Sequence, residues 1–482
     1  MSQTKKGNIK EWIHIIIGLI LMFGIPILPP MEPITEIGMQ IGGIFIGAIY
    51  LWSMVGTFWP SLLAIVALGF TDYTDMNGIF AAFSGYLPLL MLFCMIFFGA
   101  IGDCGLTQYI GRWFLTRKII NGRPSVFNFM MMVAVFAVSA FIDPLMALLV
   151  LWPTLYVILE EVGYQRNDSY YRILIVATFM AVTLGQCTLP FFGGQLIILG
   201  AFEAASSVPT NYGLYILFNL ITSLLIFLAL TLFIKYVLRP DMSKMANISI
   251  EQINKNPLPP MNKQQKIYII AAIAFLVAAL APSFLPADWT ITQFLTELNL
   301  VCFTLLAIAV LAIIKVDSKP IMDVAHITKE YVSWDLYLLV VVAVYFSGCL
   351  LDDATGIKPW LIGILNPLFG SHGYLFFVIV LFVTGVILTN FANNAIVGAI
   401  FMQIIVAMAP SMNIDNPVPL AMTMTMAMFL AVLTPAASPY AAVLHANDRV
   451  SINDIYKYGG MMVILSLIIY IALGLPIANI IF

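Results

Sequence analysis

Long apolar segments separated by short polar stretches occur along the whole chain. They lie at about residues 13–29, 38–54, 58–70, 86–111, 126–158, 171–204, 212–238, 267–285, 296–315, 335–351, 373–410, 417–445 and 456–482. A run of about 20 apolar residues suits one α-helix that crosses a bilayer. The pattern therefore predicts an all-α polytopic membrane protein with about 10–12 transmembrane segments.

Four of these segments are longer than one simple span: 126–158, 171–204, 373–410 and 417–445. Asp143-Pro144 interrupts the first, and Asn390, Asn393 and Asn394 interrupt the third. Because bilayer hydrocarbon has no water to satisfy polar groups, such breaks must be buried in protein or line a cavity. We expect broken helices or re-entrant hairpins at these places. Paired breaks in corresponding halves indicate the binding site of a transporter.

The two halves of the chain match at a nearly constant offset. Ser84–Asp103 aligns with Ser333–Asp352 at a shift of 249 residues, and Pro190 and Pro439 are the same distance apart. An odd number of spans between two repeats would invert their topologies, as is common in secondary transporters. We predict an N-terminal basic segment with the first transmembrane helix at 1–36, repeat 1 at 37–238, a polar linker at 239–266 and repeat 2 at 267–482.

Composition supports a membrane protein and argues against other classes. The chain is 62% hydrophobic and 9% charged, with a mean hydropathy of +1.00. The net charge of −3 gives no support for a nucleic-acid partner. The sequence has no nucleotide-binding loop, catalytic triad or metal-spaced cluster, so we predict neither an enzyme nor an ATP-driven pump. The five cysteines lie far apart, and we expect buried thiols rather than disulfides.

The N-terminus is expected to be a membrane span rather than a signal peptide. Lys5, Lys6 and Lys10 precede an apolar run that ends in Pro29-Pro30 without a small-residue cleavage site. The positive-inside rule places this end in the cytoplasm. We predict a multi-pass protein of the cell membrane, either a plasma membrane or a bacterial inner membrane, surrounded by the lipid bilayer.

Polar side chains at the two breaks are candidate ligands. Asp143 is the sole charge in its apolar segment, and so deep a carboxylate indicates function. An aspartate before a proline is also a good helix N-cap, which is the structural alternative. The amides of Asn390, Asn393 and Asn394 could bind a carboxylate through N–H and a cation through C=O. Their alternative role is hydrogen bonding between helices.

Proline beside glycine or other small residues interrupts the remaining two long segments. Thr188–Gln195 reads TLPFFGGQ, and Thr434–Tyr440 reads TPAASPY. Such runs can unwind a helix and expose backbone carbonyls to a cation. A kink without any ligand role is the alternative. Weaker candidates, for which we expect structural roles, are Glu203, Asp103, Asp352 and His445.

Two stretches of the second half carry a family resemblance. Trp334-Asp335 and the apolar run after it resemble the second-half entry segment of the divalent anion–sodium symporter family, within the ion-transporter superfamily. Residues 434–461 resemble the C-terminal unwound loop of that family and its next helix. The signature of the family is a Ser-Asn-Thr triplet at a helix break in each repeat. This chain departs from it at both positions, Ile142-Asp143-Pro144 and Ala392-Asn393-Asn394.

The resemblance implies a homodimer in which a transport part moves like an elevator against a scaffold. It also implies that hairpin tips and unwound loops hold the substrate and the coupling cations. Together with the residue chemistry, it predicts substrate ligands at Asn390, Asn393, Asn394, Thr188 and Thr434. The predicted cation or coupling site consists of Asp143, Gly193, Gly194, Ala437 and Ser438.

The sequence features and the resemblance together predict a secondary active transporter of a small organic anion. The resemblance implies a di- or tricarboxylate moved with Na⁺ or H⁺, and no other cofactor is expected. The fixed carboxylate of Asp143 would leave anion binding mainly to the second repeat, or would favour a less negative substrate. One alternative is a cation–proton antiporter of the same superfamily with Asp143 as the shuttle. The other is a channel-like pore, which would not show saturable uptake or counterflow.

Overall fold

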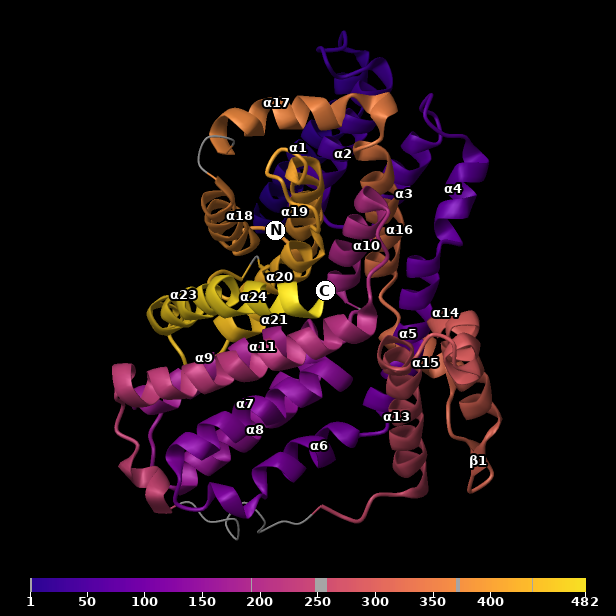
Figure 1. Cartoon of the computed structure of the whole chain (residues 1–482). Coiled ribbons are helices and arrows are strands. Elements are labelled where there is room, and N and C mark those ends of the chain that lie inside the picture. The colour runs from indigo at the N-terminus through magenta and orange to yellow at the C-terminus, as the bar shows by residue number, and fades with distance from the viewer. Residues whose placement is uncertain (1, 192, 248–257, 370–372, 436) are drawn as a thin grey trace.

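The computed structural model of the chain describes residues 2–191, 193–247, 258–369, 373–435 and 437–482. Figure 1 shows an almost entirely helical protein. In the described part, β1 (Lys315–Val316) and β2 (Lys319–Pro320) pair antiparallel as a short hairpin. A helix satisfies its own backbone hydrogen bonds, which is why apolar chains adopt it in a bilayer.

The first half and the linker contain the following helices. They are α1 (Ser2–Gly24), η1 (Ile25–Ile27), α2 (Glu36–Met54), α3 (Phe58–Leu68), α4 (Met76–Phe83), α5 (Tyr86–Asp103), α6 (Leu106–Leu115), η2 (Lys118–Ile120), α7 (Pro124–Phe141), α8 (Pro144–Glu161), α9 (Ser169–Gln186), α10 (Gly194–Ser206), α11 (Tyr212–Phe233), η3 (Ile234–Leu238) and η4 (Ser243–Asn247).

The second half continues with a similar series. It contains α13 (Lys263–Phe284), α14 (Thr290–Ile313), α15 (Val324–Tyr331), α16 (Trp334–Leu350), η5 (Asp353–Thr355), α17 (Ile357–Phe369), α18 (Gly373–Thr389), α19 (Asn394–Met408), α20 (Val418–Ala427), α21 (Pro439–His445), α22 (Ile452–Asp454), η6 (Ile455–Gly459), α23 (Gly460–Ile469), η7 (Tyr470–Gly474) and α24 (Leu475–Ile481).

The number of possible membrane spans fits the prediction. Within the described residues, 9 helical stretches are long and apolar enough to cross a bilayer, and up to 11 if each of two bent helix pairs counts as one span. The bent pairs are α15 with α16 and α17 with α18. The prediction of an all-α polytopic membrane protein is confirmed.

The four long apolar segments are broken where local sequence predicts it. The first breaks between α7 and α8, and the second between α9 and α10. The third breaks between α18 and α19, and the fourth between α20 and α21. Three of the four new helices start behind a side-chain cap: Asp143, Asn393 and Ser438 each accept a hydrogen bond from a backbone N–H of the next turn.

The elements from α5 to α10 recur in the same order from α16 to α21. Tyr86 and Trp334 start the first helix of each series, and Pro144 and Asn394 start the helix after the first break. The predicted inverted relation of the two repeats, with the boundaries given above, stays a prediction. Part of the predicted linker, residues 248–257, lies outside the described residues.

Helices from the two halves pack against each other. In Figure 1, α10 runs beside α16, and α10 also packs on α19. A side chain at Gly398 of α19 would come within 2.3 Å of Ile198 on α10, so glycine permits this close approach. Within the first half, Ser139 of α7 donates to the carbonyl oxygen of Val182 on α9 at 2.7 Å. These crossings bring the four breaks into one region.

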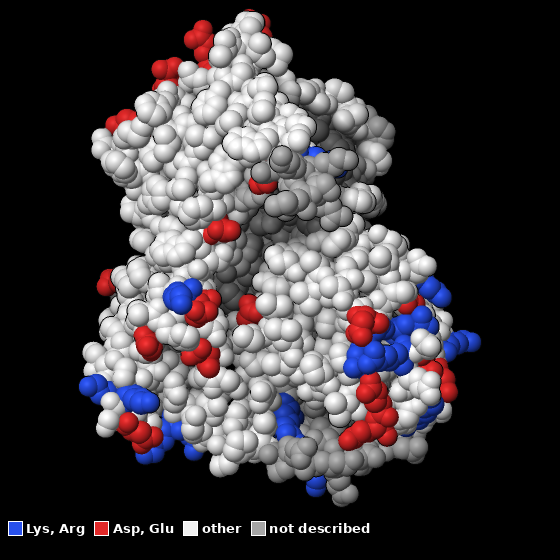
Figure 2. Space-filling model, turned by 180° about the vertical axis from the view of Figure 1, so that it is seen from behind, with Lys and Arg blue, Asp and Glu red and all other residues white. Residues whose placement is uncertain are grey.

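Basic side chains are unevenly distributed over the surface, and the surface has a hollow. Seen from behind in Figure 2, Lys and Arg gather mainly at the lower end, and a hollow separates the upper and lower masses. Large apolar side chains such as Ile464 and Ile468 of α23 are exposed, as expected for a helix that faces lipid. Cys302 of α14 is exposed and Cys104 is partly exposed, so the expectation of buried cysteines is wrong for Cys302 and is not fully met by Cys104.

Candidate functional site

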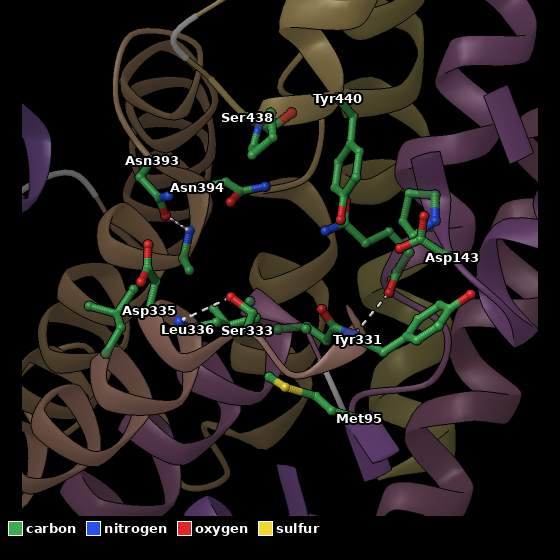
Figure 3. A pocket seen from close by; sticks show the side chains of 18 of the residues that line it. Met95, Asp143, Tyr331, Ser333, Asp335, Leu336, Asn393, Asn394, Ser438 and Tyr440 are labelled. Atoms are coloured by element: carbon green, nitrogen blue, oxygen red, sulfur yellow. Dashed lines mark hydrogen bonds between the residues drawn. The ribbon is translucent and has the colours of Figure 1, made fainter. Parts of the chain in front are cut away.

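A cavity of about 390 Å³ lies where the broken helices meet. Figure 3 shows Asp143 on one side and Asn393, Asn394 and Asp335 on the other, with Ser438 and Tyr440 above. The remaining polar lining comes from Thr57, Gln186, Gly193, Gly194, Gln195, Tyr331 and Ser333. The cavity therefore combines both hairpin tips with both unwound segments.

Six helices in the described part of the chain begin at this cavity: α3, α8, α10, α16, α19 and α21. A helix N-terminus carries about half a positive elementary charge and free N–H groups, so it attracts anions. Four of these ends carry side-chain caps, whereas Thr57 before α3 and Gly193 before α10 provide none. Convergent N-termini give the site a favourable field for an anion without any basic side chain.

Asp143 occupies the tip of the first hairpin and caps α8. Its Oδ1 accepts a hydrogen bond from the backbone N–H of Met146 at 2.9 Å. The capping role weighed from sequence is therefore present. The carboxylate also lines the cavity, so a cap and a ligand role coexist at one residue.

Asp335 is a second cavity carboxylate, which sequence reasoning missed. It lies in the first turn of α16, after Ser333, whose hydroxyl caps the helix by accepting from the N–H of Leu336 at 3.4 Å. In the sequence, Asp335 resembles an ordinary acidic residue in the first turn of a helix, where its charge interacts favourably with the helix dipole. Its side chain is exposed, and it lines the cavity together with Tyr331 and Ser333 from the two sides of the bend between α15 and α16.

Gln195, also missed, is held in one orientation by the first unwound segment. Its Nε2 donates to the backbone oxygens of Gln186 at 2.9 Å and Leu189 at 2.8 Å. The side chain is fully buried, and its Oε1 has no hydrogen-bond partner among the described residues. Because both N–H donors are engaged, Oε1 is left as a fixed acceptor for a cation or a hydroxyl group.

The charge of the lining is unusual for an anion site. Among the lining residues that the structure describes, two are aspartates and none is Lys, Arg or His. Six helix ends contribute about three positive charges in total, which exceeds the two carboxylates by about one charge. The described residues also contain no group of three or more His, Cys, Asp or Glu side chains that could hold a metal ion.

Asn390 does not line this cavity but holds the second unwound segment. Its Nδ2 donates to the carbonyl oxygens of Val386 at 2.7 Å and Leu430 at 3.0 Å. Its Oδ1 accepts from the N–H groups of Val432 at 2.9 Å and Leu433 at 2.7 Å. These contacts satisfy backbone groups that lost their helical partners. We therefore expect a positioning role in place of the predicted substrate contact.

Three further predicted ligands lie away from the cavity. Thr434 donates to the backbone oxygen of Asn390 and, with it, borders a separate apolar cavity of about 830 Å³ between α18 and the C-terminal helices. Thr188 is buried and donates to Asn219 Oδ1 at 3.0 Å. Ala437 is buried and is not among the lining residues. The structure thus brings together Asp143, Gly193, Gly194, Asn393, Asn394 and Ser438 from the predicted set.

The weaker candidates have structural contacts, as expected. Glu203 at the end of α10 accepts from the N–H of Thr210 at 2.9 Å and from the hydroxyl of Tyr212 at 3.1 Å. Asp103 lies 3.2 Å from His326 Nε2, at the end of α5. These carboxylates tie helix ends to neighbouring segments.

Comparisons with known proteins agree with this architecture. A search of curated proteins found no match. The solved structure of the YdaH transporter from Alcanivorax borkumensis, described as having an unusual topology, is similar with a TM-score of 0.61. The two are 15% identical, and the match covers 85% of this chain and 90% of that one, so it supports the fold.

A family model described as citrate transporter matches residues 49–427, which is most of the chain. The resemblance to anion transporters of the ion-transporter superfamily is thereby confirmed. The expectation that the protein is a multi-pass membrane transporter and not an enzyme is confirmed as well. The chain belongs to the citrate transporter family.

Proposed function

We propose that this protein is a secondary active transporter that carries citrate, or a closely related tricarboxylate, together with one or more cations. The observation that carries the proposal is the cavity itself. Six helix N-termini face it, two aspartates line it, and no basic residue occurs among its described lining residues. The family name supports citrate as the anion.

The charge balance explains why the anion needs a cation. The helix ends, with about half a charge each, exceed Asp143 and Asp335 by only about one positive charge, so a multiply charged anion is not fully compensated. Asp335 in the lining is exposed but Asn394 is buried, and uncompensated charge that loses part of its hydration there is costly. A proton, Na⁺ or a divalent cation bound with the anion would remove most of that cost. Anion transport is therefore coupled to cation transport.

The first repeat supplies the cation side of the site. Asp143 offers a carboxylate, and Gln195 offers an oriented amide oxygen. Hard cations prefer such oxygen ligands. The second repeat supplies Asn393 and Asn394, whose amides suit carboxylate groups. The family assignment favours this anion transporter over a cation–proton antiporter or a pore.

The proposal also covers how the substrate cavity opens alternately to the two sides of the membrane. By the resemblance described above, a homodimer would hold a scaffold while the transport part moves like an elevator. The N-terminus would face the cytoplasm, on the side of the basic residues. Helices broken at the cavity provide a substrate site that can move as a unit with the surrounding segments.

Uptake of radiolabelled citrate into proteoliposomes tests the proposal. A Na⁺ gradient, a pH gradient and added Mg²⁺ or Ca²⁺ should be imposed separately on the purified protein. We expect saturable uptake that depends on at least one of these cations, with exchange of labelled for unlabelled citrate. Saturable citrate uptake that ignores all of them, or no citrate uptake under any condition, would contradict it.

A further inference from the structure

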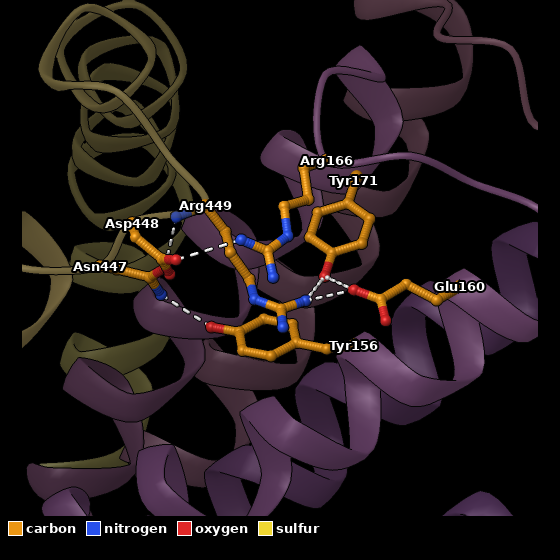
Figure 4. A network of polar contacts seen from close by, with 7 residues as sticks. All are labelled: Tyr156, Glu160, Arg166, Tyr171, Asn447, Asp448 and Arg449. Carbon is orange, nitrogen blue, oxygen red and sulfur yellow. Dashed lines mark hydrogen bonds and ion pairs between the residues drawn. The ribbon is translucent and has the colours of Figure 1, made fainter.

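A dense polar network joins the two repeats away from the cavity (Figure 4). Arg449, in the loop after α21, donates through Nη1 to Glu160 Oε1 at 2.5 Å and to the hydroxyl of Tyr171. Its guanidinium carbon lies 4.0 Å from the centre of the Tyr156 ring. The side chain of Arg449 is 17% exposed and that of Glu160 is 46% exposed, so the ion pair is shielded from water mainly on the arginine side.

Neighbouring residues of the same loop reinforce this contact. Asn447 donates to the hydroxyl of Tyr156 at 2.7 Å, and its Oδ1 accepts from the N–H of Arg449 at 3.0 Å. Asp454 accepts two hydrogen bonds of 3.0 Å from Arg172 of α9. The loop that follows α21 is thus fastened to α8 and α9 by aromatic stacking, hydrogen bonds and ion pairs together.

The network connects helices whose other ends form the cavity. The helix α8 begins after Asp143 and runs 18 residues, or about 27 Å, to the region of Glu160. The helix α21 begins after Ser438 and ends four residues before Arg449. Figure 3 shows Tyr440 of α21 on the same side of the cavity as Asp143.

A short helix needs such an anchor. With 7 residues, α21 is far below the length at which an isolated helix is stable, about 12–15 residues. Its direction is therefore set by what holds its ends. At its start Ser438 caps the N–H of Ala441 at 3.1 Å, and beyond its end Arg449 holds the following loop.

We propose that Arg449 is a positioning residue that sets the spacing of Asp143 relative to Ser438 and Tyr440 at the cavity. It acts through the helix α8, which contains Pro153, and through the short helix α21, and it does not touch the substrate. The planar guanidinium is needed because it stacks on a ring and donates to a carboxylate at once, which a lysine ammonium does not do. The proposal rests on the proposed function, since it concerns the same site.

Arg449→Ala and Arg449→Lys test this role, with Arg166→Ala as the matched control. Arg166 pairs with Asp448 of the same loop at 3.1 Å, but their side chains are 55% and 76% exposed. In folded, purified protein, we expect Arg449→Ala to raise the KM for citrate about tenfold or more, because small misplacements of a site are costly. Arg449→Lys should lie between Arg449→Ala and the wild type, and Arg166→Ala should stay within about twofold of the wild type.

Hydrogen–deuterium exchange in the absence of substrate gives an independent readout. Arg449→Ala should speed exchange of residues 439–445, and Arg166→Ala should not. Wild-type KM in folded Arg449→Ala protein, or unchanged exchange of 439–445, would overturn the proposal. If the wild type does not take up citrate at all, the proposed function fails, and the exchange result alone decides whether Arg449 positions α21.

Discussion

Replacing Asp143 with asparagine separates its two roles at the first hairpin tip. Asparagine keeps the shape and the oxygen that accepts from the N–H of Met146 at 2.9 Å, but it removes the negative charge. If the carboxylate binds the coupling cation, the variant should bind citrate yet lose cation-driven accumulation. If Asp143 acts as a cap alone, the variant should behave like the wild type.

The expected magnitudes differ for the two roles. Asp and Asn rank alike as N-caps, so the free energy of unfolding should change by less than about 0.5 kcal/mol. Losing a hydrogen bond or ion contact to a charged group costs about 1.5–3 kcal/mol. That loss corresponds to a half-saturating cation concentration about ten- to a hundredfold higher.

Proteoliposome uptake measures this concentration directly. Initial rates of citrate uptake are recorded against Na⁺, against external pH and against Mg²⁺, and citrate exchange is recorded without any gradient. In Asp143→Asn, exchange should persist while gradient-driven accumulation falls. The thermal unfolding midpoint of the purified variant shows whether the cap survives.

Asp352→Asn is the matched control. Asp352 also caps a helical turn, by accepting from the N–H of Ala354 at 2.9 Å, but it is not among the lining residues of the cavity. It should leave the cation dependence unchanged. A cation dependence of Asp143→Asn equal to that of the wild type would refute a coupling role and leave the capping role alone.

Three more predictions concern single side chains. Asn393→Ala should weaken citrate binding about ten- to a hundredfold as measured by calorimetry, and unchanged affinity would contradict this prediction. The variant loses an amide at the cavity and the Oδ1 that accepts from the N–H of Ala395 at 3.0 Å. Asn390→Ala should destabilise the fold by several kcal/mol, about 1–3 for each buried backbone group left unpaired. A melting point within about 1 °C of the wild type, which for a chain of 482 residues corresponds to roughly 1 kcal/mol, would contradict this role of Asn390. The N–H of Gln165 and the ammonium of Lys244 lower the pKa of Asp168 in the folded protein. The ionised carboxyl therefore stabilises the fold at pH values above its unfolded pKa, and this stabilisation is lost as the pH falls through its folded pKa. Asp168→Asn should therefore melt slightly below the wild type at neutral pH and equal to it in acid, and a gap that persists in acid would contradict the assignment.

Local sequence was sufficient for much of the fold. The lengths of the apolar runs predicted the class and the approximate number of spans, because the bilayer thickness sets helix length. The breaks at Asp143-Pro144 and at Asn393 were also visible, since a proline or a capping side chain acts within one helical turn. These features depend on neighbours in sequence.

The site was predicted less completely. Residues at the tips of the breaks, such as Asp143, Asn394 and Ser438, do line the cavity. Asn390 and Thr188 do not, although they lie within a few residues of a break. Their polar groups are turned toward freed backbone or another helix, and sequence does not show in which direction a side chain points near an irregular segment.

The sequence by itself determined that this chain is a multi-span helical protein, where its helices break, and that one carboxylate lies deep in an apolar stretch. Only the tertiary structure decided that Asp335 and Gln195 share the cavity with that carboxylate, and that Arg449 joins the ends of α8 and α21. The physical reason is the distance along the sequence over which each kind of interaction acts. Helix formation and capping act over a few residues. The contents of a cavity depend on which distant segments pack together, and the lining here includes Thr57 and Tyr440, which are about 380 residues apart in a chain of 482.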